Sequence, residues 1–137
     1  MFDPIPLNQT YHLGIHEFEL YDISGFDFKE ELKFPHTNGI YCFSTPLYGE
    51  TEKGLSKKKF QVLYYLGKTK DFAERFDRHH KAHELLRLKP LCISVCHCEE
   101  NAEESIENQL LSQFSFPLNI VDNSNYPKDL PTVVRED

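Results

Sequence analysis

Two apolar runs separated by a polar connection mark the first clear elements of this chain. Residues 39–44 are rich in aromatic and β-branched side chains, and residues 60–66 repeat that character. The pattern predicts an antiparallel hairpin. Its connection contains Pro46, Gly49 and Gly54 and is too long for a tight turn, so we expect a mobile loop there.

Helix signals replace strand signals after the second run. Asp71 and Glu74 have the spacing of a capping box, and the pattern predicts a helix over residues 70–86. Arg75 and His79 lie four positions apart, so on such a helix they project side by side from one face.

A third strand and a second helix are predicted next. Pro90 blocks further helix, and residues 91–96 alternate as a half-buried strand does. Asn101, with Glu104 three residues later, is typical of a helix start, and this helix is expected to end near residue 114.

Together these elements predict an α/β (α+β) domain. We expect a small antiparallel sheet of about three strands flanked by helices, over residues 38–120. A chain of 137 residues fits one compact domain with extensions. Residues 1–37 are interpreted as an extension of uncertain shape, and residues 121–137 as a loop-like tail.

Membrane and secretion signals are not found in the sequence. No window approaches the roughly 18 to 20 apolar residues that a membrane span needs, and Met1 is not followed by a basic and then apolar leader. We therefore expect a soluble cytoplasmic protein without a membrane partner. The few clustered cysteines are expected to be reduced thiols; they are Cys42, Cys92, Cys96 and Cys98.

Charge is distributed unevenly along the chain. The net charge of −7 is unusual for a protein that binds nucleic acid. However, residues 53–89 hold eleven cations and four anions, whereas the rest of the chain holds four cations and eighteen anions. This asymmetry is expected if one face meets phosphates while an acidic surface stays in solvent or meets a protein partner.

Six short elements, in order, resemble the GIY-YIG nuclease family over about three fifths of the chain. Each falls on a predicted strand, on a predicted helix or at a helix end. The spacing of 23 residues between the first two elements is wider than in compact members. The elements are Gly39-Ile40-Tyr41, Tyr65-Leu66-Gly67, Arg75, His79, Glu107 and Pro117-Leu118-Asn119.

The resemblance implies a metal-dependent endonuclease that hydrolyses nucleic-acid phosphodiesters, with DNA favoured over RNA. It implies that Glu107 holds one Mg²⁺ or Mn²⁺ ion whose other ligands are mainly waters and phosphate oxygens. Arg75 would grip the scissile phosphate through its planar fork. Tyr41 would act as the general base or position the attacking water, and Lys68 would favour its phenolate.

The remaining site residues have supporting roles in this interpretation. Tyr65 and His79 would complete a hydrogen-bond network, and Asn119 would brace the site from the end of the second helix. Substrate binding is assigned to Lys68, Asn119 and the basic run Lys57, Lys58 and Lys59.

The residues that follow Glu107 indicate that its carboxylate lies on an apolar helix face. Leu110, Leu111 and Phe114 follow it at helical spacing, so the carboxylate lies inside the apolar arc of its own helix. A buried glutamate without a partner is costly, which favours a metal ion, an arginine or a functional cleft beside it.

Other functions remain open at this stage. The fold could serve as a non-catalytic nucleic-acid-binding module, or as an interaction module recruited by a partner through the acidic surface. A zinc site is a further alternative, built from His79, His80 and His83 or from the cysteine cluster with His97. The cysteines lack a Cys-x-x-Cys knuckle, which favours packed thiols.

Overall fold

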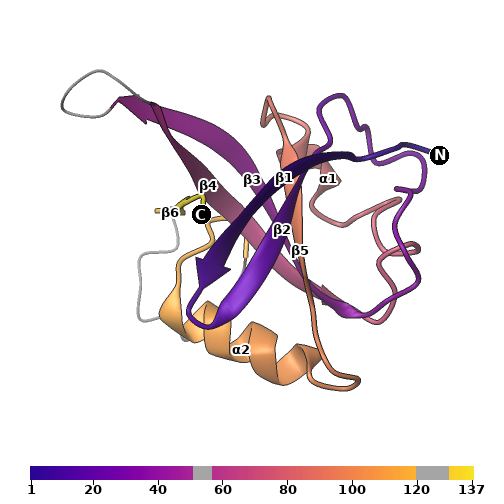
Figure 1. Ribbon diagram of the computed structural model, residues 1–137. Coiled ribbons are helices and arrows are strands. Elements are labelled where there is room, and N and C mark those ends of the chain that lie inside the picture. The colour runs from indigo at the N-terminus through magenta and orange to yellow at the C-terminus, as the bar shows by residue number, and fades with distance from the viewer. Residues whose placement is uncertain (51–56, 120–129) are drawn as a thin grey trace.

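The computed structural model describes residues 1–50, 57–119 and 130–137. Its dominant feature is a six-stranded antiparallel sheet, curved into a half-barrel and accompanied in the described ranges by two short helices (Figure 1). The elements in chain order are β1 (Ile5–Leu13), β2 (His16–Asp22), β3 (Gly39–Glu50), β4 (Lys57–Thr69), α1 (Ala82–Leu85), β5 (Cys92–His97), α2 (Glu103–Gln113) and β6 (Thr132–Arg135).

The predicted three-stranded sheet flanked by helices is wrong. The strand order is β1-β2-β5-β3-β4-β6, so the three predicted strands form only the centre of a larger sheet. The β1–β2 hairpin extends the sheet beyond β5, and β6 extends it beyond β4. The fold class was mispredicted because both flanking pieces come from segments that were interpreted as an extension and a tail.

The β1–β2 hairpin has a clear physical origin in the sequence. Tyr11, Leu13, Phe18 and Leu20 alternate with polar residues, and all four are buried on one face of the sheet. Gly14 has a positive φ of 60° at the turn between them, a conformation that glycine adopts without strain. Period-two burial and a turn glycine therefore specify two strands here.

The helix predicted over residues 70–86 is also wrong, because only its end, α1, is helical. The preceding backbone is bonded to the N-terminal segment instead. The Phe72 amide donates to the Thr37 carbonyl at 2.9 Å, and the Arg78 amide donates to the Phe28 carbonyl at 2.9 Å. Arg78 also has a φ of 56°, which an α-helix does not accommodate.

The second helix was located correctly, but its start differs from the prediction. α2 begins at Glu103 after the N-cap residue Ala102, and no side chain caps it. Asn101, the expected cap, has a φ of 66° and accepts a hydrogen bond from Lys70 Nζ at 2.9 Å. Asn101 therefore makes a tertiary contact with Lys70 instead of capping α2.

The β3–β4 hairpin is longer than predicted. Its pairing continues from Gly39↔Thr69 to Glu50↔Lys57, and it extends past the neighbouring strands in Figure 1. The predicted mobility of the connection falls on residues 51–56, which lie outside the described residues. Likewise, of the tail only residues 130–137 are described, and they contain a strand where we expected loop.

Buried side chains cover both faces of the sheet. One cluster contains Phe28, Tyr41 and Phe76, and the other contains Phe18 and Leu110 of α2. Neighbouring residues of β3 contribute to opposite clusters, as strand geometry requires. No helix in the described ranges is long and apolar enough to cross a membrane.

Candidate active site

The centre of the candidate site is the hydroxyl group of Tyr41. β3 directs this side chain into the aromatic cluster, where it is fully buried. Arg75 Nε donates a hydrogen bond to the hydroxyl oxygen at 3.2 Å, and His79 Nε2 lies 2.8 Å from it. The two residues were predicted to share a helix face; they lie instead on an irregular segment, yet both reach the same oxygen.

The tautomer of His79 follows from its second hydrogen bond. The backbone amide of Lys81 donates to His79 Nδ1 at 3.0 Å, so this nitrogen carries no proton. Burial and the nearby charge of Arg75 lower the pKa of His79 to about 3, which keeps the ring neutral. The single ring proton is therefore on Nε2, and His79 donates to Tyr41.

Tyr41 and Tyr65 are neighbours in the same cluster, with ring centroids 6.1 Å apart. Burial raises the pKa of both hydroxyls above the ordinary tyrosine value, and the charge of Arg75 opposes the rise for both. Both tyrosines are therefore protonated at neutral pH.

Glu107 lies close to the tyrosine cluster. It is half-buried, and burial raises the pKa of its carboxyl while the charges of Lys68 and Arg75 oppose the rise. Its charge in turn contributes to raising the pKa of Tyr65. Within the part of the chain that the structure describes, the Glu107 carboxylate forms no hydrogen bond or ion pair, so its oxygens are available to a ligand.

Asn119 fixes the strand that carries Tyr65. Its side-chain amide accepts from the Leu66 amide at 2.9 Å and donates to the Leu66 carbonyl at 2.8 Å. Asn119 therefore occupies both backbone groups of one β4 residue, as a neighbouring strand would. The contact places Asn119 against β4 next to Tyr65, and its role in the site stays a prediction.

No match is found among protein-family models, curated proteins or solved structures. The resemblance to GIY-YIG nucleases therefore depends on the residues themselves and on their arrangement.

Two of the predicted substrate-binding groups lie at opposite ends of β4. Lys68 Nζ is 3.7 Å from Glu104 Oε1, and Arg75 rather than Lys68 contacts Tyr41. The run Lys57–Lys59 lies at the far end of β4, and its nearest member, Lys59, is about 26 Å along the strand from Gly67 at about 3.3 Å per strand residue. The side chains of Lys57 and Lys58 lie outside what the structure describes.

Sequence reasoning gave no role in the nuclease site to two polar residues at this end of the sheet. His80 is exposed, and its Nε2 lies 3.2 Å from the Tyr65 hydroxyl. Glu103 is buried, accepting from Asn38 at 2.7 Å and from Lys70 at 3.1 Å. The position of His80 directly after His79 in the sequence could have indicated a role for it. No local pattern points to Glu103, because its partners Asn38 and Lys70 are distant in sequence.

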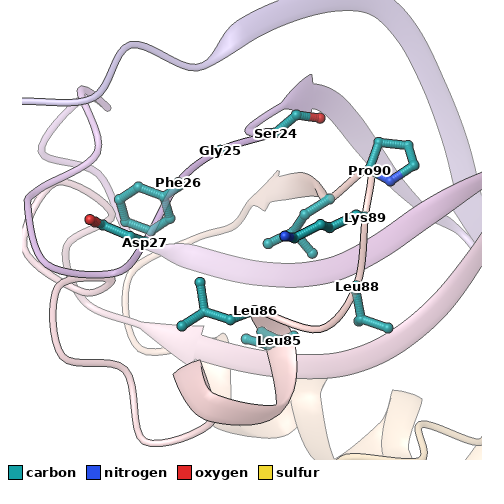
Figure 2. Close-up of a pocket in the computed structure, with 10 residues that line it drawn as sticks. Ser24, Gly25, Phe26, Asp27, Leu85, Leu86, Leu88, Lys89 and Pro90 are labelled. Carbon is teal, nitrogen blue, oxygen red and sulfur yellow. The ribbon is translucent and has the colours of Figure 1, made fainter.

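A hollow of about 360 Å³ opens beside the site. Lys68 and Glu104 line it together with Lys70 and Glu103, so both cations and carboxylates face the opening. A second cavity, of about 650 Å³, lies between residues 24–27 and residues 85–91 and contains none of the predicted site residues (Figure 2).

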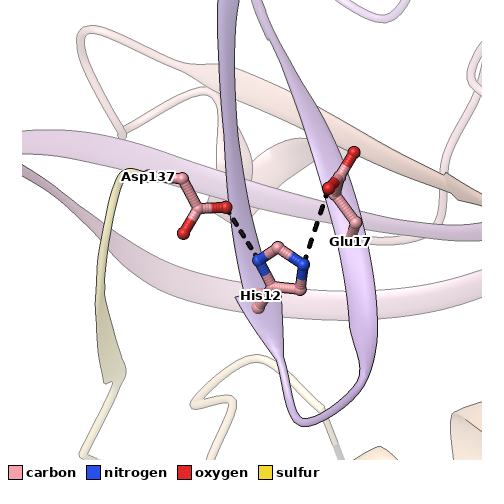
Figure 3. A group of neighbouring side chains, drawn as sticks. All are labelled: His12, Glu17 and Asp137. Carbon is pink, nitrogen blue, oxygen red and sulfur yellow. Dashed lines mark hydrogen bonds and ion pairs between the residues drawn. The ribbon is translucent and has the colours of Figure 1, made fainter.

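Two groups of metal-ligand type, one exposed and one partly exposed, occur elsewhere in the described ranges. In the first, His12 Nδ1 lies 2.7 Å from Asp137 and His12 Nε2 lies 3.5 Å from Glu17 (Figure 3). Each ring nitrogen already faces a carboxylate, so this group links the β1–β2 hairpin to the end of the chain. The second group is His36, Asp71 and Glu74.

The cysteines agree with the expectation of reduced thiols. All four are free, and Cys42, Cys92 and Cys96 are buried. Burial raises the pKa of each of these three thiols, which disfavours the thiolate that a zinc ion requires.

Proposed function

We propose that this chain is a GIY-YIG-type endonuclease that hydrolyses nucleic-acid phosphodiesters with a divalent metal ion, DNA being favoured over RNA. The observation that carries the proposal is the convergence of His79 and Arg75 on the Tyr41 hydroxyl, next to the Tyr65 ring and beside a half-buried carboxylate without a hydrogen-bond or ion-pair partner in the described residues. Convergence of such groups from distant segments is typical of a catalytic site.

Glu107 fits the metal-holding role. Mg²⁺ and Mn²⁺ prefer oxygen ligands, and Mg²⁺ commonly uses one or two carboxylates with waters and phosphate oxygens. Glu107 offers such a carboxylate, with its oxygens unoccupied by described partners. A bound ion would neutralise charge that develops on the phosphate and help the 3′ oxygen to leave.

Arg75 and Lys68 provide positive charge for the substrate. Arg75 is half-buried and uses its Nε to contact Tyr41, which leaves its terminal nitrogens available to a phosphate. Lys68 is exposed at the mouth of the hollow beside Glu104. The charges of both cations act on the Glu107 carboxyl, so the phosphate and the ion would meet near it.

Tyr41 and Tyr65 differ in burial, and this difference suggests different roles. Tyr41 is fully buried, whereas Tyr65 is 7% exposed. We therefore assign contact with the attacking water to Tyr65, and assign to Tyr41 the task of orienting it. This revises the role that the resemblance gave to Tyr41.

Cleavage assays on the whole chain test the proposal. Supercoiled plasmid, branched DNA and RNA are incubated with Mg²⁺, with Mn²⁺ or with EDTA. We expect nicking or cleavage of DNA with either ion and none with EDTA. Binding without cleavage under either ion would favour the non-catalytic binding module. Cleavage or binding only after addition of a partner would favour the recruited interaction module.

A further inference from the structure

The tyrosine cluster of the site reaches the protein surface at His80. His79 Nε2 donates to Tyr41, and the Tyr41 and Tyr65 rings are neighbours, with centroids 6.1 Å apart. The Tyr65 hydroxyl lies 3.2 Å from His80 Nε2, within hydrogen-bond distance. His80 is exposed, in contrast to the three buried groups before it.

We propose that His80 is a proton-relay residue that takes the Tyr65 proton and releases it to solvent. This inference rests on the proposed function. The resemblance assigns no role to His80, and the bonding around Tyr65 is what singles it out. With Tyr41 and Tyr65 buried, an exposed acceptor provides the route by which a proton from the nucleophile leaves the site.

The proton transfers balance over one turnover. An O–H bond of the attacking water breaks as its oxygen bonds to phosphorus, and its proton passes to the Tyr65 oxygen. The bond from phosphorus to the 3′ oxygen breaks, and the leaving oxygen takes the electron pair and then a proton from bulk water. The Tyr65 hydroxyl proton moves to His80 Nε2 at the same time as the water proton moves. The imidazolium then loses its Nδ1 proton to bulk water, and tautomer exchange returns the remaining ring proton from Nε2 to Nδ1, so that Nε2 can accept from Tyr65 again.

The surroundings of His80 suit a neutral ring that accepts a proton transiently. The ring stacks on His79, with centroids 4.7 Å apart and an interplanar angle of 19°. Burial and the charges of Arg75 and Lys81 lower the pKa of His80, while Glu84 opposes them. His80 is therefore neutral at pH 7 and ready to accept.

The pH dependence follows from the groups that face His80. Only the neutral ring accepts a proton, so cleavage should be lost as pH falls through the pKa of His80, below the ordinary histidine value. His79 has a pKa of about 3 and so does not titrate in that range. Tyr65 has a raised pKa and stays protonated there.

Replacement of His80 by alanine tests the relay on the whole chain. We expect His80→Ala to reduce kcat by about 10²-fold or more, the usual scale for loss of a proton-transfer group. The acidic limb of the kcat profile should disappear, and added imidazole should restore part of the rate. His83→Ala is the matched control: His83 is exposed on α1 and bonded to Arg87 rather than to the tyrosines.

Nitrogen NMR of the histidine rings gives a readout independent of turnover. We expect neutral His80 to carry its proton on Nδ1, and Tyr65→Phe to shift its pKa. Unchanged kcat and pH profile in His80→Ala would overturn the relay alone, as would a loss of rate that imidazole does not restore. Absence of cleavage by the wild-type chain with either ion would overturn the nuclease and the relay together.

Discussion

Gly67 lies directly against the ring of Tyr41. The two residues are paired across β3 and β4, and a Cβ atom at Gly67 would be 2.3 Å from Tyr41 Cζ and 2.4 Å from its hydroxyl oxygen. Only glycine allows this approach of backbone to side chain. The glycine of one strand thus fixes the position of the tyrosine on the other.

Gly67→Ala should therefore damage both stability and activity. The added methyl group must displace the Tyr41 ring, a form of overpacking that costs about 1–3 kcal/mol. We expect the urea midpoint to fall and cleavage to weaken with it. Gly49→Ala is the control, because its Cβ would lie 3.3 Å from the edge of the Phe60 ring in a less crowded place. Equal stability of both variants would contradict the close packing.

Neutral His79 should make the fold sensitive to acid. Its pKa is about 3 in the folded chain and about 6.5 in the unfolded one, so the unfolded state binds a proton that the folded state does not. This contribution to stability is complete above pH 6.5 and is lost as pH falls toward 3, by up to about 1.4 kcal/mol per pH unit.

The matched variant is His79→Gln, whose amide can still donate to Tyr41 but does not titrate. Urea unfolding at several pH values should show a shallower loss of stability below pH 6.5 than in the wild type. His83→Gln, at an exposed position, should keep the wild-type slope. The same slope in all three proteins would contradict the assignment of a neutral, buried His79.

The site residues stay a prediction, but part of their arrangement follows from the sequence. The predicted pairing of the two central strands is present, and it places the Tyr41 and Tyr65 rings 6.1 Å apart. The role of Gly67 as a packing residue was not visible, since it depends on cross-strand register. His80 was missed for a similar reason: its partner, Tyr65, lies 15 positions earlier.

The fold was mispredicted where tertiary contacts override local preference. The capping signal at Asp71 is real, since its carboxylate accepts from the Ala73 amide at 2.9 Å. The helix nevertheless does not form, because Phe72 and Arg78 bond to the N-terminal segment. β6 could not be predicted from its sequence, because its four residues are exposed or half-buried. They form a strand by pairing with the edge of β4.

The basic run at the end of β4 should contribute affinity rather than chemistry. Replacing Lys57, Lys58 and Lys59 by alanine should weaken DNA binding and lower the salt slope by about one for each lysine that contacts a phosphate. Cleavage at saturating DNA should survive. Lys29→Ala with Lys33→Ala serves as the control from outside the basic segment. An unchanged slope in the triple variant would show that this run does not meet DNA.

Glu107→Gln is the most direct test of the nuclease, because it removes one charge and keeps the shape of the side chain. Thermal unfolding, DNA binding and cleavage with Mg²⁺ are measured together, with Glu104→Gln as the control one turn earlier on α2. We expect cleavage to be abolished in Glu107→Gln while binding is nearly intact, since Arg75 and the basic segment remain. The melting temperature should hold or rise, because a half-buried carboxylate without a described partner is replaced by a neutral amide.

Glu104→Gln should cleave like the wild type. Full activity in Glu107→Gln would contradict the metal-holding assignment, and a fall in melting temperature that accounts for the lost activity would give Glu107 a structural role instead.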